Sequence, residues 1–253
     1  MLFRSVARDL LYGVVEVAYP HTTIILGGEP FKVPTRWRKW FYEGYEQPTF
    51  DFVRAHCKPG ATLIDIGAHF GIFTICALRK VGPSGKVISF EPCAATRSVL
   101  EKTLELNGFS GIPEIRTEAV SNVTGRSSFF SSTIPGDAAN SLISNAHHLT
   151  KSEVQTIRLD DIHLSRVDAI KIDAEGAELQ ILDGSRALII KHRPAVLLSV
   201  HPMQIGRSGK SLGDLWDVLE YLKLAPYLKD QPVSSEWFRR QTELFDVSLE
   251  ALA

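Results

Sequence analysis

Cysteine is scarce in this chain, with three residues among 253. Cys57, Cys76 and Cys93 are odd in number and show no C-x-x-C spacing. Neither a disulfide framework nor a cysteine zinc site is therefore indicated. Free thiols persist in reducing compartments, so we expect the protein to be cytoplasmic.

Long apolar runs are also lacking, and the N-terminus comes nearest to one. Charged residues interrupt the stretch 1–19 before a signal-peptide core or a membrane span could form, namely Arg4, Arg8, Asp9 and Glu16. The apolar residues of this stretch recur at helical spacing, which predicts an amphipathic helix packed against the domain. Attachment of this helix to a membrane surface is the alternative.

Neither sign of charge is in excess. The chain has 28 Lys and Arg against 29 Asp and Glu, which gives a formal net charge of −1. Such a balance provides no overall field that would draw the protein to nucleic acid or to an anionic membrane. We therefore expect a small, specific ligand and no nucleic acid as partner, and the interrupted apolar stretches predict no transmembrane segment.

What the chain does contain, from Thr62 onward, is an alternation of short apolar runs with longer helical patterns. The predicted strands are 62–66, 86–90, 114–118, 168–173 and 195–200, followed by 227–230 and 243–249. The predicted helices are 70–81, 94–107, 178–191 and 212–224. This alternation is typical of parallel strands joined by helices that cover both faces of a sheet.

The expected fold class is therefore α/β, a doubly wound, Rossmann-like sheet of seven mostly parallel strands with an N-terminal helical extension. We place the extension, or cap, at residues 1–50 and the main domain at residues 51–253. The segment 121–161 is rich in Ser, Asn, Thr and Gly and interrupts the alternation. We predict a small hairpin and an exposed loop there, and the length of the segment suggests a binding role.

The first chemical motif is DIGAHFG at residues 65–71, where the first predicted strand ends and a helix begins. Gly67 and Gly71 permit tight backbone geometry and close approach of a ligand at the carboxyl edge of the sheet. Glu91, in the segment FEP at the end of the next strand, lies 20 residues after Gly71. An acidic residue at this place accepts hydrogen bonds from the ribose of an adenosine-containing ligand.

Asp65 indicates which ligand this is, because it occupies the place of the leading glycine in a dinucleotide fingerprint. A carboxylate would repel the pyrophosphate of NAD but would favour a cationic sulfonium. The residues therefore favour S-adenosylmethionine over NAD. The alternative is that Asp65 only caps the following turn.

The second motif is KIDAEGAE at residues 171–178, at the end of the fourth predicted strand. Asp173, Glu175 and Glu178 are close enough to repel one another, so a cation, a bound hydroxyl or a functional proton is expected beside them. We predict that Asp173 faces the transferable methyl group. The alternatives are helix capping, a favourable interaction with the helix dipole, or a divalent metal held by these carboxylates. Our prediction for the site includes no metal.

Histidines provide a candidate general base. His201 directly follows the fifth strand and reaches the same sheet edge as Asp173. A pKa near neutrality would suit removal of an alcohol proton, and a solvated loop residue is the alternative. We expect His69 to pack near the ligand, and His147 and His148 to be solvated.

Together these segments resemble the FkbM family of class I methyltransferases. The resemblance covers roughly residues 42–202 and rests on segments in the family's order: Gly44-Tyr45-Glu46, 65–71, 90–92, Ala119-Val120-Ser121, Ser141-Leu142, Leu159-Asp160-Asp161 and 171–178. The chain departs from the family pattern at Ser199, where members often carry Glu two residues before the histidine. The resemblance implies an S-adenosylmethionine-dependent methyltransferase that methylates a hydroxyl of a sugar, glycolipid or natural product. The partner that it implies is therefore a small-molecule or glycan acceptor.

The resemblance also implies roles for individual residues. Asp65, Gly67 and Gly71 would line the methionyl part of the cofactor, and Glu91 would hold its ribose. Glu118 and Ala119 would border the adenine, Asp173 would lie between cofactor and acceptor, and the loop around Ser141 and Leu142 would cover the site. The predicted cofactor-binding residues are Glu46, Asp65, Gly67, Ala68, His69, Gly71, Thr74, Glu91, Pro92, Glu118, Ala119 and Asp173, and the predicted catalytic residues are Asp173, Glu175 and His201.

Three other functions compete with this prediction. A protein of the same fold could bind S-adenosylmethionine without catalysis, and a related sheet could serve an NAD-dependent oxidoreductase. A nucleic-acid methyltransferase is disfavoured, because the sequence has neither an Asn-Pro-Pro-Tyr segment for a flipped base nor an excess of basic residues.

Overall fold

The computed structural model describes residues 19–42, 44–132, 140–144 and 150–252. The predicted amphipathic helix of residues 1–19 lies outside these ranges apart from its last residue, and His147 and His148 also lie outside them. The cap predicted for residues 1–50 is therefore described from Tyr19 onward.

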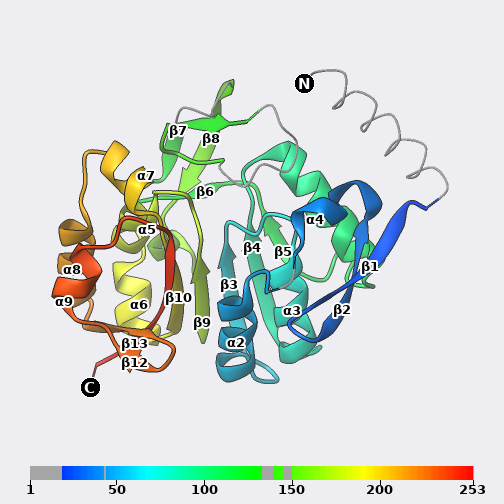
Figure 1. Ribbon diagram of the computed structural model, residues 1–253, viewed down its shortest axis with the longest axis horizontal. Helices are drawn as coiled ribbons and strands as arrows, with labels where there is room; N and C mark the ends of the chain where they lie inside the picture. The colour runs from blue at the N-terminus through cyan, green and yellow to red at the C-terminus, as the bar shows by residue number, and fades with distance from the viewer. Residues whose placement is uncertain (1–18, 43, 133–139, 145–149, 253) are drawn as a thin grey trace.

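The described chain is built around a large sheet with the strand order β12-β11-β13-β10-β9-β3-β4-β5 (Figure 1). The strands are β3 (Thr62–Ile66), β4 (Lys86–Phe90), β5 (Glu114–Arg116), β9 (Ala169–Ile172), β10 (Ala195–Val200), β11 (Leu224–Leu228), β12 (Gln231–Pro232) and β13 (Phe245–Ala251). Strands β10, β9, β3, β4 and β5 are parallel neighbours, and β13 pairs antiparallel with both β10 and β11. The doubly wound, Rossmann-like prediction is thus confirmed.

The sheet has eight strands among the described residues, whereas seven were predicted. The additional strand is β12, which pairs with the end of β11 through Tyr227–Pro232 and Leu228–Gln231. Lys229 and Asp230, the two residues between them, both have positive φ angles of 49° and 64°. Two successive residues of this kind form a tight hairpin turn, which folds the chain back onto β11.

Two apolar cores lie on the two faces of the sheet, because successive side chains of a strand point to opposite faces. Ile64 and Ile66 belong to the core that contains α5 (Glu178–Asp183), α6 (Arg186–His192) and α8 (Leu212–Tyr221). Leu63 belongs to the core that contains α2 (Gln47–His56), α3 (Ile72–Val81) and α4 (Ala94–Leu106). Helices on both faces explain why the central strands are almost continuously apolar.

The helix predicted at 178–191 is two helices, α5 and α6, separated at Gly184 and Ser185. A Cβ atom on Gly184 would lie 2.0 Å from the carbonyl oxygen of Ser121. The Gly184 carbonyl also accepts a hydrogen bond from the amide of Asp160, at 3.0 Å. The chain breaks its helix here because neighbouring segments pack directly against its backbone.

The N-terminal part of the described chain forms a hairpin that was not predicted, β1 (His21–Leu26) paired antiparallel with β2 (Glu29–Pro34). The 3₁₀ helix η1 (Thr35–Trp40) and then α2 follow. Phe31 and Trp37 are buried in the same core as α3. The predicted boundary at residue 50 lies inside α2, and the division into two parts stays a prediction.

A second, three-stranded sheet stands above the carboxyl ends of the main strands, at the top of Figure 1. Its strands are β6 (Ala119–Val120), β7 (Gly125–Ser131) and β8 (Thr150–Ile157), and the 3₁₀ helix η2 (Leu159–Asp161) follows. β7 and β8 pair antiparallel from Gly125–Thr156 to Ser131–Thr150, which confirms the small hairpin predicted within 121–161. Two short helices, α7 (Pro202–Arg207) and α9 (Ser235–Arg239), complete the described elements.

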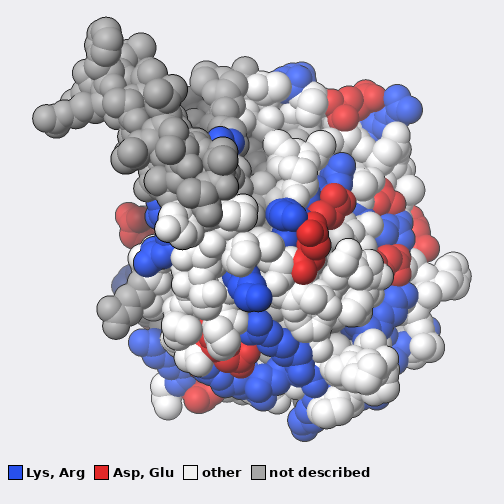
Figure 2. All heavy atoms as spheres, turned by 90° about the vertical axis from the view of Figure 1, so that its right-hand side faces the viewer, with Lys and Arg blue, Asp and Glu red and all other residues white. Residues whose placement is uncertain are grey.

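Charged side chains of both signs are grouped on the surface. On the face shown in Figure 2, Lys and Arg gather along the lower edge, and Asp and Glu form smaller groups. The formal net charge of −1 therefore arises from opposed groups and not from a weakly charged surface. Among the described residues, no helix has the length and apolar character needed to cross a bilayer.

Candidate active site

A pocket opens at the carboxyl edge of the main sheet, beneath the β7–β8 hairpin. It encloses about 930 Å³ of empty space, counting its open mouth. The lining comes from the ends of β3, β4, β5 and β9, from α3, β6, β7 and α5, and from the segments around residues 45 and 141. These residues are Tyr45, Glu46, Ile66, Gly67, Ala68, His69, Phe70, Ile72, Phe73, Phe90, Glu91, Pro92, Glu118, Ala119, Val120, Phe129, Asn140, Ser141, Leu142, Lys171, Asp173, Ala174, Glu175, Ala177 and Ile181. Ligands of open α/β sheets bind at this edge.

Gly67 brings the end of β3 against the end of β9. A Cβ atom at this position would lie 1.9 Å from the carbonyl oxygen of Asp173, and the φ angle of Gly67 is +79°. The amides of Gly67 and Ala68 both donate to the carbonyl of Phe90, at 3.1 and 3.0 Å. Only glycine satisfies both the angle and the contact, so Gly67 sets the spacing between the strand ends that line the pocket.

Glu91 lies in the pocket wall with its carboxylate held by backbone amides. The amide of His69 donates to Oε2 and the amide of Cys93 to Oε1, each at 3.0 Å. Burial raises the pKa of Glu91 to about 7, against the opposing effect of these two amides and of Arg97. The fixed carboxylate still has lone pairs available for hydroxyl donors in the pocket.

Asp65, Gly71 and Thr74 do not line the pocket, contrary to the prediction. Asp65 shares a sheet face with Leu63 and is fully buried under α3, where the Thr74 hydroxyl donates to its Oδ2 at 2.6 Å. Burial raises the pKa of Asp65. Gly71 packs against Leu100, which a Cβ atom would approach to 2.4 Å. The side chain of Asp65 points under the helix because the alternation of β3 puts it on that face.

The start of α3 contradicts the alternative that Asp65 caps the turn. The N-cap of α3 is Gly71, and no side chain caps it. Asp65 therefore supports the turn from beneath, through the Thr74 hydroxyl, which also lies 2.9 Å from the hydroxyl of Ser89.

Lys171 is a buried lysine that was not among the predicted site residues. Its Nζ lies 3.1 Å from Oδ2 of Asp173, and its side chain is 3% exposed. Burial opposes its charge, but Asp173, Glu46 and Asp65 raise the pKa of Lys171 above its ordinary value. Lys171 and His201 in turn hold the pKa of Asp173 below its ordinary value, although burial acts against them. Asp173 is thus ionised and fixed in direction.

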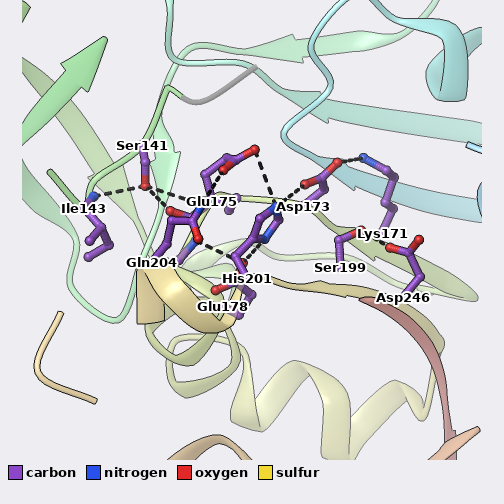
Figure 3. Close-up of polar contacts among 12 residues, drawn as sticks. Ser141, Ile143, Lys171, Asp173, Glu175, Glu178, Ser199, His201, Gln204 and Asp246 are labelled. Carbon is purple, nitrogen blue, oxygen red and sulfur yellow. Dashed lines mark hydrogen bonds and ion pairs between the residues drawn. The ribbon is translucent and has the colours of Figure 1, made fainter. Parts of the chain in front are cut away.

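His201 lies at the centre of three carboxylates (Figure 3). Its Nδ1 is 2.7 Å from Oε1 of Glu178, and its Nε2 is 3.4 Å from Oε1 of Glu175 and 3.7 Å from Oδ1 of Asp173. Burial lowers the pKa of His201, but the hydrogen bonds with Glu175 and Glu178 have a larger opposite effect. The pKa of His201 is raised to about 11. His201 does not line the pocket. These contacts favour Asp173 or Glu175 over His201 as the acceptor of a substrate proton.

Three residues of the pocket wall other than glycine have positive φ angles, which residues with a side chain rarely adopt. They are Glu46 at 47°, His69 at 49° and Glu175 at 51°. Such conformations cost of order 1–3 kcal/mol each and cluster at functional sites. In this chain they turn the backbone at three separate segments around one cavity.

Glu46 and Tyr45 enter the pocket from the segment before α2. Burial raises the pKa of Glu46, and the charge of Lys171 opposes this rise. Burial, together with the charge of Glu46, raises the pKa of Tyr45 well above its ordinary value. Tyr45 was part of the family resemblance but not of the predicted site. Its aromatic neighbours, Phe41 and Tyr42, are the sequence signal that could have identified it.

The residues predicted to border the adenine and to cover the site also line the pocket. Glu118 and Ala119 line it, and Arg116 lowers the pKa of Glu118 through a side-chain hydrogen bond. The Ser141 hydroxyl donates to the carbonyl of Glu175, at 2.8 Å, and so ties the described part of the loop to the end of β9. Leu142 lines the pocket beside it.

Ser199, which departs from the family pattern, has a carboxylate partner. Its hydroxyl donates to Oδ1 of Asp246 on β13, at 2.6 Å (Figure 3). Burial raises the pKa of Asp246, and the charge of Asp173 adds to this effect. Although Ser199 replaces the family's Glu on β10, Asp246 of the neighbouring strand β13 places a carboxyl group beside it.

Comparison with known proteins matches residues 65–225 of the 253 to the methyltransferase FkbM domain. Methyltransferase 1 of Beauveria bassiana is 28% identical over 143 residues, which cover 48% of this chain and 57% of that protein. Methyltransferase sdnD of Sordaria araneosa is 28% identical over 167 residues, which cover 51% of this chain and 64% of that protein. The chain thus spans less than two thirds of either relative.

Solved structures show the same fold at low identity. A putative rRNA methylase from Clostridium thermocellum aligns with a TM-score of 0.53 and 11% identity, over 84% of this chain and 98% of that one. An S-adenosylmethionine-dependent O-methyltransferase from Thermotoga maritima aligns with a TM-score of 0.50 and 13% identity, over 92% and 79%. At such low identity, these two neighbours inform on the fold alone.

Proposed function

The chain belongs to the FkbM methyltransferase family, and from this premise we propose that it transfers a methyl group from S-adenosylmethionine to a hydroxyl of a sugar, glycolipid or natural-product acceptor. The observation that carries the proposal is the pocket in which Glu91 and Asp173 share one cavity across the Gly67 turn. These two carboxylates can hold the ribose and face the sulfonium of a single bound molecule.

In the proposed complex, the Glu91 carboxylate accepts hydrogen bonds from the ribose hydroxyls. Gly67, Ala68 and His69 follow the nucleoside and the methionyl chain along the turn, and Pro92, Glu118 and Ala119 border the adenine. Glu46 faces the cofactor from the segment before α2. Asp65 acts indirectly in this proposal, because it supports the turn from beneath.

The reaction is a displacement at the methyl carbon. The acceptor oxygen forms a bond to the methyl group as the carbon–sulfur bond breaks, and the bonding electrons return to sulfur to give neutral S-adenosylhomocysteine. The hydroxyl proton passes to Asp173 or Glu175, the ionisable groups that line the pocket at the end of β9. Alignment of the reacting atoms at about 3 Å supplies much of the acceleration.

The test is methyl transfer from labelled S-adenosylmethionine to a metabolite extract, followed by mass identification of the product. We expect a gain of one methyl group on a hydroxyl-bearing compound. Methylation of RNA, of a protein or of an amine in place of a hydroxyl would contradict the proposed acceptor class.

The rival functions are separated by binding. A titration comparing S-adenosylhomocysteine with NADH distinguishes the methyltransferase from an oxidoreductase, and we expect binding of the former alone. A protein that binds S-adenosylhomocysteine but transfers no methyl group to any compound of the extract would favour the non-catalytic alternative. We also propose a cytoplasmic location, which the three free cysteines support.

A further inference from the structure

The ring of His201 contacts its three carboxylates at unequal distances. Nε2 of His201 lies 3.4 Å from Glu175 and 3.7 Å from Asp173. Charge-assisted N–H···O hydrogen bonds are about 2.7–2.9 Å long. On the other side of the ring, the contact from Nδ1 to Glu178 has that length, at 2.7 Å. The ring is therefore held tightly on one side and loosely on the other.

The loose side has the dimensions of a metal-ligand set. One oxygen each from Asp173 and Glu175 and one ring nitrogen of His201 lie within 4.8 Å of one another. Ligand atoms about 2.0–2.2 Å from a metal ion lie about 2.8–3.6 Å apart when they occupy neighbouring positions. The 3.4 Å distance from Nε2 lies in this range, the 3.7 Å distance slightly exceeds it, and the oxygens of Asp173 and Glu175 lie within 4.8 Å of each other. The side chains must therefore draw together for one ion to contact all three groups.

The opposite side of the ring has the contact that metal-binding histidines require. The carboxylate of Glu178, which is fully buried, fixes Nδ1, and this leaves Nε2 to point toward Asp173 and Glu175 (Figure 3). A histidine that binds a metal through one nitrogen usually donates the other N–H to a carboxylate, which sets the tautomer and the ring direction. The His201 side chain is 5% exposed, so this direction is enforced by the packing around it.

We propose that Asp173, Glu175 and His201 bind one divalent metal ion of the first transition row. Two carboxylate oxygens and one imidazole nitrogen suit Mn²⁺, Fe²⁺ or Zn²⁺ better than Mg²⁺, which prefers oxygen ligands alone. Asp173 and Glu175 also line the pocket, so an ion bound to them would border it. An acceptor hydroxyl would bind there, and this last step rests on the proposed function.

The site is tested by titrating Mn²⁺ into the full chain after treatment with a chelator, with the signal of free Mn²⁺ followed by electron paramagnetic resonance. We expect one bound ion per chain. His201→Gln and Glu175→Gln should each weaken the affinity at least about tenfold, and Glu178→Gln should weaken it by about 10–100-fold, although Glu178 does not contact the ion. Zn²⁺ should compete for the same site.

The control variant is Glu153→Gln, which removes an exposed carboxylate that pairs with Arg126 outside the pocket and should bind Mn²⁺ like the unmodified protein. Absence of stoichiometric Mn²⁺ and Zn²⁺ binding would overturn the inference, and so would binding that survives both His201→Gln and Glu175→Gln. S-adenosylhomocysteine is titrated in parallel. A protein that binds it but no metal refutes the metal site and leaves the proposed function intact, and the reverse result refutes the proposed function alone.

Discussion

At the residue scale, the position of Asp173 makes it sensitive to removal of its charge. Lys171 and Gly67 fix its side chain and its carbonyl, so Asp173→Asn keeps the shape of the site. Turnover should fall by about 10²–10⁴ through loss of the proton acceptor and of the charge that faces the sulfonium. The affinity for S-adenosylhomocysteine should change only a few-fold, because this product has no sulfonium charge.

Steady-state kinetics with the identified acceptor and calorimetric titration of S-adenosylhomocysteine check this pair of effects. The matched control is Asp183→Asn, an aspartate paired with Arg186 at 2.6 Å and away from the pocket. The assignment of Asp173 is refuted by an Asp173→Asn variant that keeps full turnover.

Glu91 makes a pH-dependent contribution at the same scale. Burial raises its pKa from 4.5 to about 7, so the folded protein holds this proton more tightly than the unfolded chain does. The resulting stabilisation is complete below pH 4.5 and is lost as the pH rises through about 7. The ligand-free protein should lose up to about 3 kcal/mol through this group between pH 5 and pH 8.

Urea unfolding of the unmodified protein and of Glu91→Gln at several pH values isolates the contribution of Glu91. The difference in unfolding free energy between them should shift in favour of Glu91→Gln as the pH rises, since glutamine does not ionise. Parallel pH profiles for the two proteins would show that burial does not perturb Glu91.

The affinity for S-adenosylhomocysteine should depend on the same ionisation. Ribose hydroxyls donate better to a carboxylate than to a carboxylic acid, so binding should strengthen from pH 6 to pH 8, as measured by calorimetry. The Glu91→Gln variant should bind about tenfold or more weakly and show a flatter profile. An equally steep profile in this variant would assign the pH dependence to another group.

The sequence located these residues better than it oriented them. Glu91 and Gly67 were recognisable because a motif fixes their place at a strand end, and both line the pocket. Asp65 belongs to the same motif, but its direction depends on which face of β3 it occupies, and that requires the register of the sheet. Lys171 was missed because its role depends on the charges of Asp173 and Glu46, which lie beside it only in the folded chain.

At the element scale, the turn after β3 depends on a close approach between two strands. Gly67→Ala would place a methyl group 1.9 Å from the carbonyl of Asp173 and hold a strained φ angle. Gly82→Ala at the end of α3 carries a similar φ of +65° but has no atom within 4 Å of the added methyl. The Gly82 variant should lose about 1–3 kcal/mol for the backbone angles alone, whereas the Gly67 variant should lose more and bind S-adenosylhomocysteine poorly.

Denaturant unfolding and calorimetry of both variants separate the two costs. Equal destabilisation of the two variants, with S-adenosylhomocysteine binding retained by both, would show that the close approach to Asp173 is not needed for the site.

Element prediction succeeded where local pattern and burial agree. The strands β3, β4 and β10 were predicted with their observed bounds, because each is a short apolar run closed by turn residues. The break between α5 and α6 was missed, since it is imposed by the backbone of Ser121, which is distant in sequence. The β1–β2 hairpin was also missed, because its pairing lies outside the regular alternation of strands and helices.

At the scale of the whole molecule, the pocket combines segments that meet only in the folded chain, from Tyr45 to Ile181. A ligand that spans them binds the folded state and not the unfolded one, so it should raise stability by about 2.7 kcal/mol at a concentration 100 times its Kd. For a chain of this size the melting temperature should rise by about 5–10 °C. We expect this shift with S-adenosylhomocysteine, measured by calorimetric melting, and none with NADH at equal concentration. Because the shift follows from the shared cavity, Gly67→Ala should reduce it even where the variant remains folded, and a full shift in that variant would mean that the ligand binds elsewhere.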